Sequence, residues 1–106
     1  MTNAQPPQSY GLSPRWSEIT QELLFDEIWE RPILTPRERS IVVVSALIAQ
    51  YRGDQLKRHI MRAFGNGLTK EELGEIFLQL AFYSGWPAIA NATNMAEEAI
   101  AEMEQA

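Results

Sequence analysis

Apolar residues recur at helical spacing along most of the chain, and short polar or glycine-containing segments separate these stretches. The first stretch follows Ser13 and Pro14, a pair typical of a helix N-terminus, and it ends before Pro32, which cannot continue a helix. Its apolar stripe consists of Trp16, Ile19, Leu23 and Ile28. The spacing of this stripe predicts a first helix.

A second helix is predicted to begin at the sequence TPRE, residues 35–38, which has the form of a capping box with proline at the first helical position. The following sequence, SIVVVSALIAQ, is rich in β-branched residues, so a buried strand fits its periodicity as well. The strong cap and the helical neighbours favour a helix. A helix that is apolar all round is expected to be buried on every side.

A third helix is predicted over GDQLKRHIMRAF, and it ends at GNG, where Asn66 and Gly67 are expected to supply a left-handed turn. The sequence TKEE, residues 69–72, is a second capping box and predicts a fourth helix. Its apolar face consists of Leu73, Ile76, Phe77, Leu80 and Ala81, while Leu78 and Phe82 fall outside that face.

The sequence GWP, residues 85–87, breaks the fourth helix, and a fifth helix is predicted from about Pro87. Its alanines, suited to close helix packing, are Ala88, Ala90, Ala92, Ala96 and Ala99. The pattern therefore predicts an all-α fold of about five helices, with a flexible arm over residues 1–13 and a single domain over residues 14–106. A domain this small cannot cover both faces of its second and fourth helices, which indicates a symmetric homo-oligomer.

Composition narrows the classes of function. The chain has 106 residues, no cysteine and a net charge of −5, so thiol redox chemistry is excluded and a nucleic-acid partner is not expected. No apolar run could span a membrane and the N-terminus does not resemble a secretion signal, so we expect a cytoplasmic protein without a membrane partner. The basic cluster Arg52, Lys57, Arg58 and Arg62 is either a solvated face or an anion site. A metal site is not expected with a single histidine and no cysteine.

That single histidine, His59, shares a helical face with Leu56, Ile60 and Ala63. An imidazole on an apolar stripe needs a partner for its nitrogens, because an unpaired buried polar group costs about 1–3 kcal/mol. Two interpretations remain open from the residues alone. His59 is either a core histidine bonded to a carbonyl or a tyrosine, or the acid–base group of an enzyme.

Three segments carry a resemblance to a known family: TPRERS at residues 35–40, the block from Leu56 to Glu75 with the pattern LKRHI…A…NG.T.EEL.E, and YSGWPA at residues 83–88. They occur in order over most of residues 31–100 and resemble the carboxymuconolactone decarboxylase family. The resemblance implies an all-α fold of the AhpD type that forms homotrimers or homohexamers, with active sites near subunit contacts.

The redox branch of that family carries a Cys-x-x-Cys pair before its histidine, and these positions are Arg52 and Gln55 here. The resemblance therefore points to the branch that needs no cofactor and decarboxylates 4-carboxymuconolactone. Loss of CO₂ leaves a carbanion conjugated to the lactone carbonyl, so the site must bind carboxylates, stabilise the developing oxyanion and return a proton. His59 is the expected acid–base group and Arg39 the expected carboxylate-binding residue; for Arg39, an ion pair with Glu38 or Glu72 is the equally weighted alternative.

Four residues near the break between the fourth and fifth helices are expected to contact the small carboxylate or lactone substrate: Tyr83, Ser84, Trp86 and Asn91. For Tyr83 and Trp86, ordinary packing is the competing interpretation. For the whole protein, the competing interpretation is a family member of non-redox type without decarboxylase activity, such as an isomerase or a small-ligand-binding accessory protein.

Overall fold

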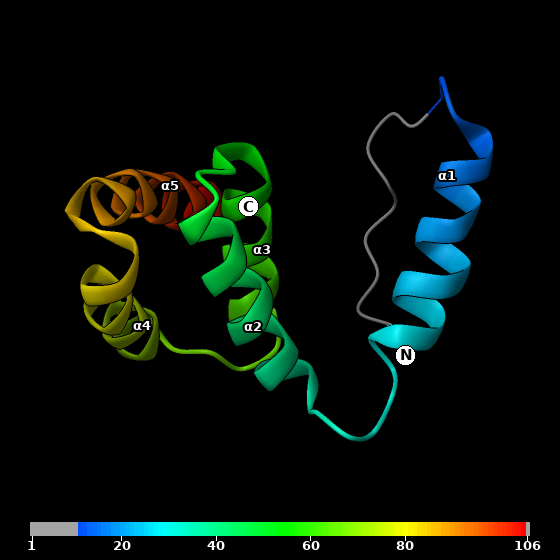
Figure 1. The fold of residues 1–106 in the computed structure, drawn as a ribbon, viewed down its shortest axis with the longest axis horizontal. Coiled ribbons are helices and arrows are strands. Elements are labelled where there is room, and N and C mark those ends of the chain that lie inside the picture. The colour runs from blue at the N-terminus through cyan, green and yellow to red at the C-terminus, as the bar shows by residue number, and fades with distance from the viewer. Residues whose placement is uncertain (1–10, 106) are drawn as a thin grey trace. The chain divides into compact units, whose positions relative to one another are not determined.

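The computed structural model describes residues 11–105, and all regular structure in that range is helical, which confirms the predicted all-α class. In chain order the elements are α1 (Pro14–Ile19), η1 (Thr20–Ile28), α2 (Pro36–Ala49), α3 (Gly53–Gly65), α4 (Lys70–Ser84) and α5 (Trp86–Gln105) (Figure 1). Contacts divide the chain into two compact units, Met1–Pro36 and Arg37–Ala106. Most of the predicted arm over residues 1–13 lies outside the described residues, and the predicted single domain over residues 14–106 stays a prediction.

The first unit differs from the regular α-helix that the sequence predicted. The α-helix ends at Ile19, and η1 continues as a π-helix, whose hydrogen bonds connect residues five apart. The buried side chains are Phe25 and Trp29, which stack with ring centroids 6.2 Å apart. The predicted stripe of Trp16, Ile19, Leu23 and Ile28 remains exposed. A wider helical turn changes which residues share a face, so a stripe read at α-helical spacing does not match the buried face.

Helix α2 begins at Pro36, as the sequence predicted, but only one face of it is buried. Ser40, Val44 and Ile48 point into the second unit with 0–1% of their surface exposed. Val42 on the opposite face is 58% exposed. The expectation of burial on every side is therefore wrong for the single chain, because α2 is a surface helix of this unit.

Helix α3 ends in a Schellman motif. The Leu68 N–H donates to the Ala63 carbonyl at 2.9 Å, and the Gly67 N–H donates to the Phe64 carbonyl at 3.1 Å. Gly67 takes the left-handed conformation with φ +100°, whereas Asn66, with φ −91°, does not. The predicted stop is confirmed, and the left-handed residue in it is Gly67 alone.

The capping box predicted for α4 is formed in full. The Glu72 N–H donates to the Thr69 hydroxyl, and the Thr69 N–H donates to the Glu72 carboxylate, both at 3.0 Å. Glu72 also forms an ion pair with Arg37 at the start of α2. The pKa of Glu72 is lowered, first by the Thr69 N–H and then by Arg37. The carboxylate of Glu72 therefore caps the N-terminus of α4 and connects this helix to α2.

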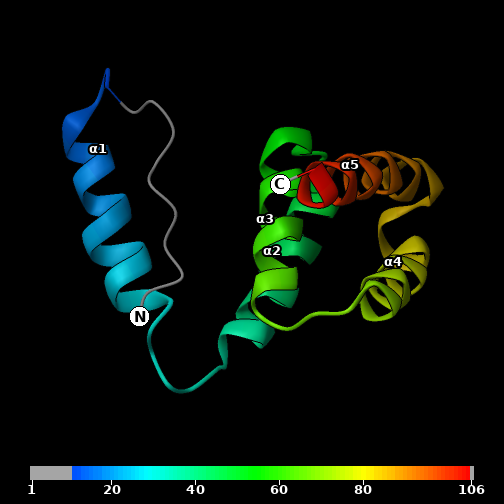
Figure 2. The ribbon, with the colours of Figure 1, turned by 180° about the vertical axis from the view of Figure 1, so that it is seen from behind.

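Helix α5 provides the surface on which α3 and α4 pack, and Figures 1 and 2 show it crossing α3. Its buried residues are all alanines: Ala88, Ala92, Ala96 and Ala99. Small side chains allow helix backbones to approach closely, and a Cβ added at Gly53 of α3 would lie 3.6 Å from the Met95 sulfur. At the edge of this contact, Lys57 pairs with Glu102 at 2.5 Å. The predicted role of the alanines is confirmed, except that Ala90 is exposed.

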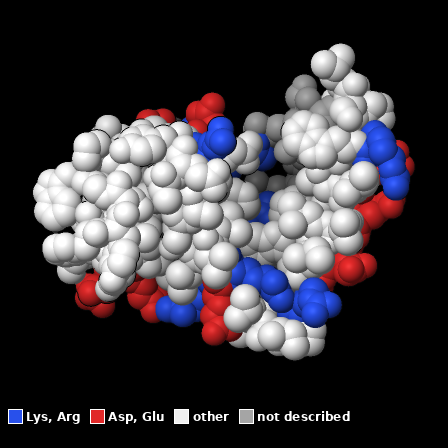
Figure 3. Space-filling model, in the orientation of Figure 1, with Lys and Arg blue, Asp and Glu red and all other residues white. Residues whose placement is uncertain are grey.

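Several large apolar side chains remain on the surface where α4 meets α5. Leu78 and Phe82, both predicted to lie off the apolar face of α4, are 56% and 72% exposed. Uncharged side chains cover this corner in Figure 3. No helix within residues 11–105 is long and apolar enough to cross a membrane.

Replacement of Gly67 tests the turn that ends α3. We expect Gly67→Ala to lower the free energy of unfolding by about 1–2 kcal/mol, since a side chain at positive φ brings Cβ against the following carbonyl. Gly74→Ala is the matched control: Gly74 is exposed within α4, nothing lies within 4 Å of an added Cβ, and we expect stabilisation of up to about 1 kcal/mol. Urea denaturation measures both. Equal effects would contradict the assigned turn.

Candidate functional site

His59 lies at the boundary between the core and the surface of the second unit. Its neighbours on α3, Leu56, Ile60 and Ala63, are fully buried, so the helix cannot rotate without exposing them. The imidazole itself is half-buried, and its Nδ1 atom is shielded from solvent. The predicted placement on the buried stripe is therefore refined: His59 lies at the margin of that stripe.

The surroundings of His59 favour its neutral form. Burial, and after it the positive charges of Arg62 and Arg58, together lower the pKa of His59 to about 4. An imidazole with this pKa is protonated in about one molecule in a thousand at pH 7. In the free protein the imidazole of His59 is therefore mostly neutral near pH 7.

Arg62 is the part of the site that the sequence did not identify. It was grouped with a basic cluster for which a solvated face was one interpretation, yet it is only 8% exposed, with Nε and Nη1 shielded from solvent. Its pKa is lowered, first by burial and then by Arg58. Residues three apart on a helix share a side of it, so the spacing of Arg62 from His59 was the available signal.

Asn66 connects the end of α3 to the start of α2. Its side-chain amide donates to the Ser40 hydroxyl at 2.9 Å, and its backbone N–H donates to the Arg62 carbonyl, also at 2.9 Å. Ser40 is 1% exposed, and the preceding Arg39 is half-buried with its Nε shielded. The carboxylate of Glu72, one of the two alternative partners considered for Arg39, is bound by Arg37. The assignment of Arg39 to carboxylate binding stays a prediction.

The four residues expected near the substrate lie around the α4–α5 corner. Ser84 and Asn91 are half-buried, whereas Tyr83 and Trp86 are 78% and 66% exposed. Trp86 packs edge-on against Phe82, with ring centroids 5.6 Å apart. Core packing therefore does not explain Tyr83 and Trp86 within this chain. Their contact with a substrate stays a prediction.

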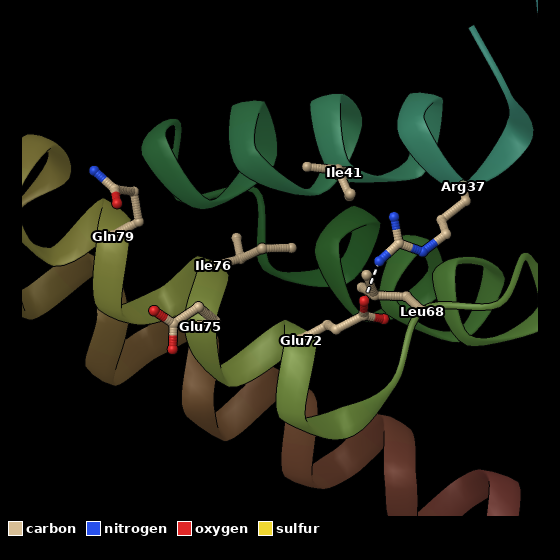
Figure 4. Close-up of a pocket in the computed structure, with 7 residues that line it drawn as sticks. All are labelled: Arg37, Ile41, Leu68, Glu72, Glu75, Ile76 and Gln79. Atoms are coloured by element: carbon tan, nitrogen blue, oxygen red, sulfur yellow. Dashed lines mark hydrogen bonds and ion pairs between the residues drawn. The ribbon is translucent and has the colours of Figure 1, made fainter.

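A groove of about 300 Å³ lies between α2 and α4 (Figure 4). Ile41, Leu68 and Ile76 form its apolar surface, and the Arg37–Glu72 ion pair bounds one end, as the close-up shows. Its lining includes neither His59 nor any other residue predicted for the site. The groove and the predicted acid–base site therefore have no lining residue in common. Its lining otherwise consists of the polar residues Glu75 and Gln79.

The described residues form a helical protein in which the single histidine lies beside two arginines. The profile of the carboxymuconolactone decarboxylase family matches residues 14–98. A 4-carboxymuconolactone decarboxylase of Acinetobacter baylyi is 42% identical over 77 residues, which cover 73% of this chain and 58% of that protein.

Two more distant relatives extend the comparison. A nitrosuccinic acid decarboxylase of Metarhizium robertsii is 30% identical over 86 residues, covering 81% of this chain and 60% of that protein. An uncharacterized 15.0 kDa protein of Paracoccus denitrificans is 27% identical over 86 residues, covering 79% of this chain and 64% of its own length. The chain thus spans about three-fifths of the length of these relatives. It belongs to the carboxymuconolactone decarboxylase family, as its motifs predicted.

The pKa of His59 has a measurable consequence for stability. Between pH 6.5 and about 4 the unfolded chain binds a proton that the folded chain does not, so we expect the contribution of His59 to stability to be complete above pH 6.5 and lost as the pH falls towards 4. NMR titration of the imidazole Hε1 proton should give a midpoint near 4. His59→Gln should remove this component from the pH dependence of urea unfolding. A midpoint at or above 6.5 would contradict the described surroundings.

Proposed function

We propose that the protein decarboxylates a small carboxylic acid without a cofactor, and that His59 is its acid–base group. The single observation that carries the proposal is the position of a neutral, half-buried imidazole beside the positive charges of Arg58 and Arg62, in a chain of this family. Decarboxylation requires cationic groups for the substrate carboxylate and a group that returns a proton to carbon. Both kinds of group are present on α3.

The names of two relatives suggest what their substrates share. Carboxymuconolactone offers a conjugated lactone carbonyl, and nitrosuccinic acid a nitro group, as the acceptor of the electron pair that CO₂ leaves behind. In each compound the charge passes to an oxygen atom of the substrate itself. A substrate of this class, a carboxylic acid with an electron-accepting group close to the departing carboxylate, is the one we propose here.

The reaction begins when the bond between the departing carboxylate and the carbon that carries it breaks. The electron pair of that bond moves to an oxygen of the electron-accepting group, and CO₂ leaves. A proton from the imidazolium of His59 then forms the new C–H bond, and solvent restores that proton. His59 carries little proton in the free protein, so the bound anion, by cancelling part of the positive potential of the arginines, raises its pKa and recruits the proton.

The remaining residues have proposed roles in binding. Arg39 holds a carboxylate through its planar fork, and Ser84 and Asn91 donate or accept hydrogen bonds at the α4–α5 corner. Tyr83 and Trp86 supply aromatic surface for the apolar part of the substrate, once a second subunit covers them.

The activity is tested by adding 4-carboxymuconolactone to the purified protein and following its ultraviolet spectrum, with nitrosuccinate as a second substrate. We expect wild type to consume one of the two and His59→Gln to lower kcat by about 10²–10⁴-fold, since that is the usual contribution of acid–base catalysis. Asn94→Gln, on the exposed face of α5, is the control. Unchanged spectra with both acids would favour a binding or accessory role, and full activity of His59→Gln would refute the acid–base role of His59.

We also propose a symmetric homo-oligomer, trimer or hexamer, formed through the apolar corner of α4 and α5. The support is the exposure of Leu78, Phe82 and Trp86. Exposed apolar surface is unfavourable in water, and covering this corner with a second subunit would stabilise the protein. The same surface contains two of the proposed substrate-binding residues, so assembly would also complete the pocket.

Light scattering during size-exclusion chromatography tests the assembly. We expect wild type to have a mass that is a multiple of 12.1 kDa, and Phe82→Glu to reduce it, because a carboxylate would be buried in the interface. Asn94→Glu introduces the same charge elsewhere on α5 and should leave the mass unchanged. A wild-type monomer at 50 µM would refute the proposal.

A further inference from the structure

All charged residues of helix α4 lie in its first half: Lys70, Glu71, Glu72 and Glu75. From residue 76 to residue 96, through the end of α4 and into α5, the chain has no charged residue. Within this uncharged stretch Leu78 and Phe82 are exposed on α4. Charged residues are depleted and aromatic residues enriched at the centre of subunit contacts, so the second half of α4 has the composition of such a contact.

The groove between α2 and α4 lies on the same side of α4 as Phe82. Residues three, four or seven apart on a helix share a side of it. Glu75 and Gln79 line the groove and precede Phe82 by seven and three residues, and Ile41 and Ile76 belong to its apolar surface (Figure 4). One side of α4 therefore carries both an apolar groove and an exposed phenyl ring.

A phenyl ring matches this groove in size and in chemistry. The groove has a volume of about 300 Å³, and a protein cavity of about 150 Å³ is already large enough to bind benzene. Phe82 of the same chain contacts Trp86 at the α4–α5 corner and does not line the groove. The ring that fits the groove is therefore supplied by a second copy of the chain.

The distribution of charge along α4 determines how two copies pair. In a parallel pair the carboxylates of one α4 helix would lie against the same carboxylates of the other, which is unfavourable. In an antiparallel pair the charged half of each helix lies against the uncharged half of the other. Gln79 is midway between Ile76 in the groove and Phe82, so a two-fold axis at Gln79 places each ring over the groove of the other copy.

We propose that the α2–α4 groove binds Phe82 of a second copy of the chain, in an antiparallel pairing of two α4 helices about a two-fold axis at Gln79. This inference rests on the proposed assembly and specifies the symmetry of its contact. The two rings enter the two grooves together, as a self-complementary interface requires. A two-fold contact joins subunits in pairs, so the assembly contains an even number of subunits, as in the proposed hexamer but not in a trimer.

Because the chain contains no cysteine, engineered disulfides test the pairing directly. Gln79 is exposed and lies at the proposed axis, so we expect Gln79→Cys to form a disulfide-linked dimer with its own copy on oxidation. Glu75→Cys, also at an exposed position of the groove, is the matched control. Its two copies would lie about 12 Å apart along the helices, beyond the reach of a disulfide. Non-reducing electrophoresis measures both.

A mixture of two variants tests the antiparallel direction. Residues 75 and 83 are both four positions from the axis, so Glu75→Cys and Tyr83→Cys should link to each other and neither should link to itself. Self-linkage of Glu75→Cys would show a parallel pairing and overturn the inference. A Gln79→Cys protein that assembles like wild type but forms no disulfide would overturn it as well, and so would a wild-type mass of one or three subunits.

Variants of α2 test whether the groove itself belongs to the contact. Ile41→Ala removes apolar surface from the groove and should raise the subunit dissociation constant about 5-fold or more, because less apolar surface is then buried. Val42→Ala shortens an exposed side chain on the opposite face of α2 and should change the constant less than twofold. Sedimentation velocity over a dilution series measures the constant. Equal effects of the two substitutions would refute occupation of the groove.

Cross-linking and kinetics together distinguish failure of this inference from failure of the proposed function. If Gln79→Cys forms the disulfide and neither 4-carboxymuconolactone nor nitrosuccinate is consumed, the two-fold contact stands and decarboxylation of those acids does not. If wild type consumes one of the acids and Gln79→Cys forms no disulfide, decarboxylation stands and the two-fold contact is wrong.

Discussion

The complete burial of one face of α3 is the constraint on which the rest of the second unit depends. Leu56, Ile60 and Ala63 have no exposed surface, and removal of a buried isoleucine side chain to alanine costs about 2–5 kcal/mol. Because that face is fixed against the core, the orientation of the adjoining side of the helix is fixed as well. His59 and Arg62 are therefore held at the boundary of the core, where partial desolvation lowers the pKa of each.

The regular helices of the second unit could be predicted because their limits are encoded locally. The capping box at Thr69 and Glu72 and the stop at Gly67 each need only a few consecutive residues. The π-helix could not be predicted in this way. Phe25 and Trp29 are buried and Trp16 is exposed, in keeping with the wider hydrogen-bonding pattern. No local sequence signal indicates that pattern.

Only the part of the candidate site that depends on local sequence could be predicted. His59 was found because it is the one histidine of the chain and follows an apolar stripe. Arg62 was not found, because its burial depends on how α3 packs against other elements. From the sequence alone an arginine is expected to face solvent. The exposure of Tyr83 and Trp86 likewise depends on how α4 and α5 meet, which periodicity does not convey.

Glu72 combines two connections that are usually made by separate residues. It caps α4 through Thr69 and holds Arg37 of α2. An aspartate would be one methylene too short for the reciprocal cap and the pair together, and a glutamine would keep the cap but not the charge. A substitution at residue 37, 69 or 72 therefore removes a contact of at least one of the other two, although the three lie in different segments of the chain.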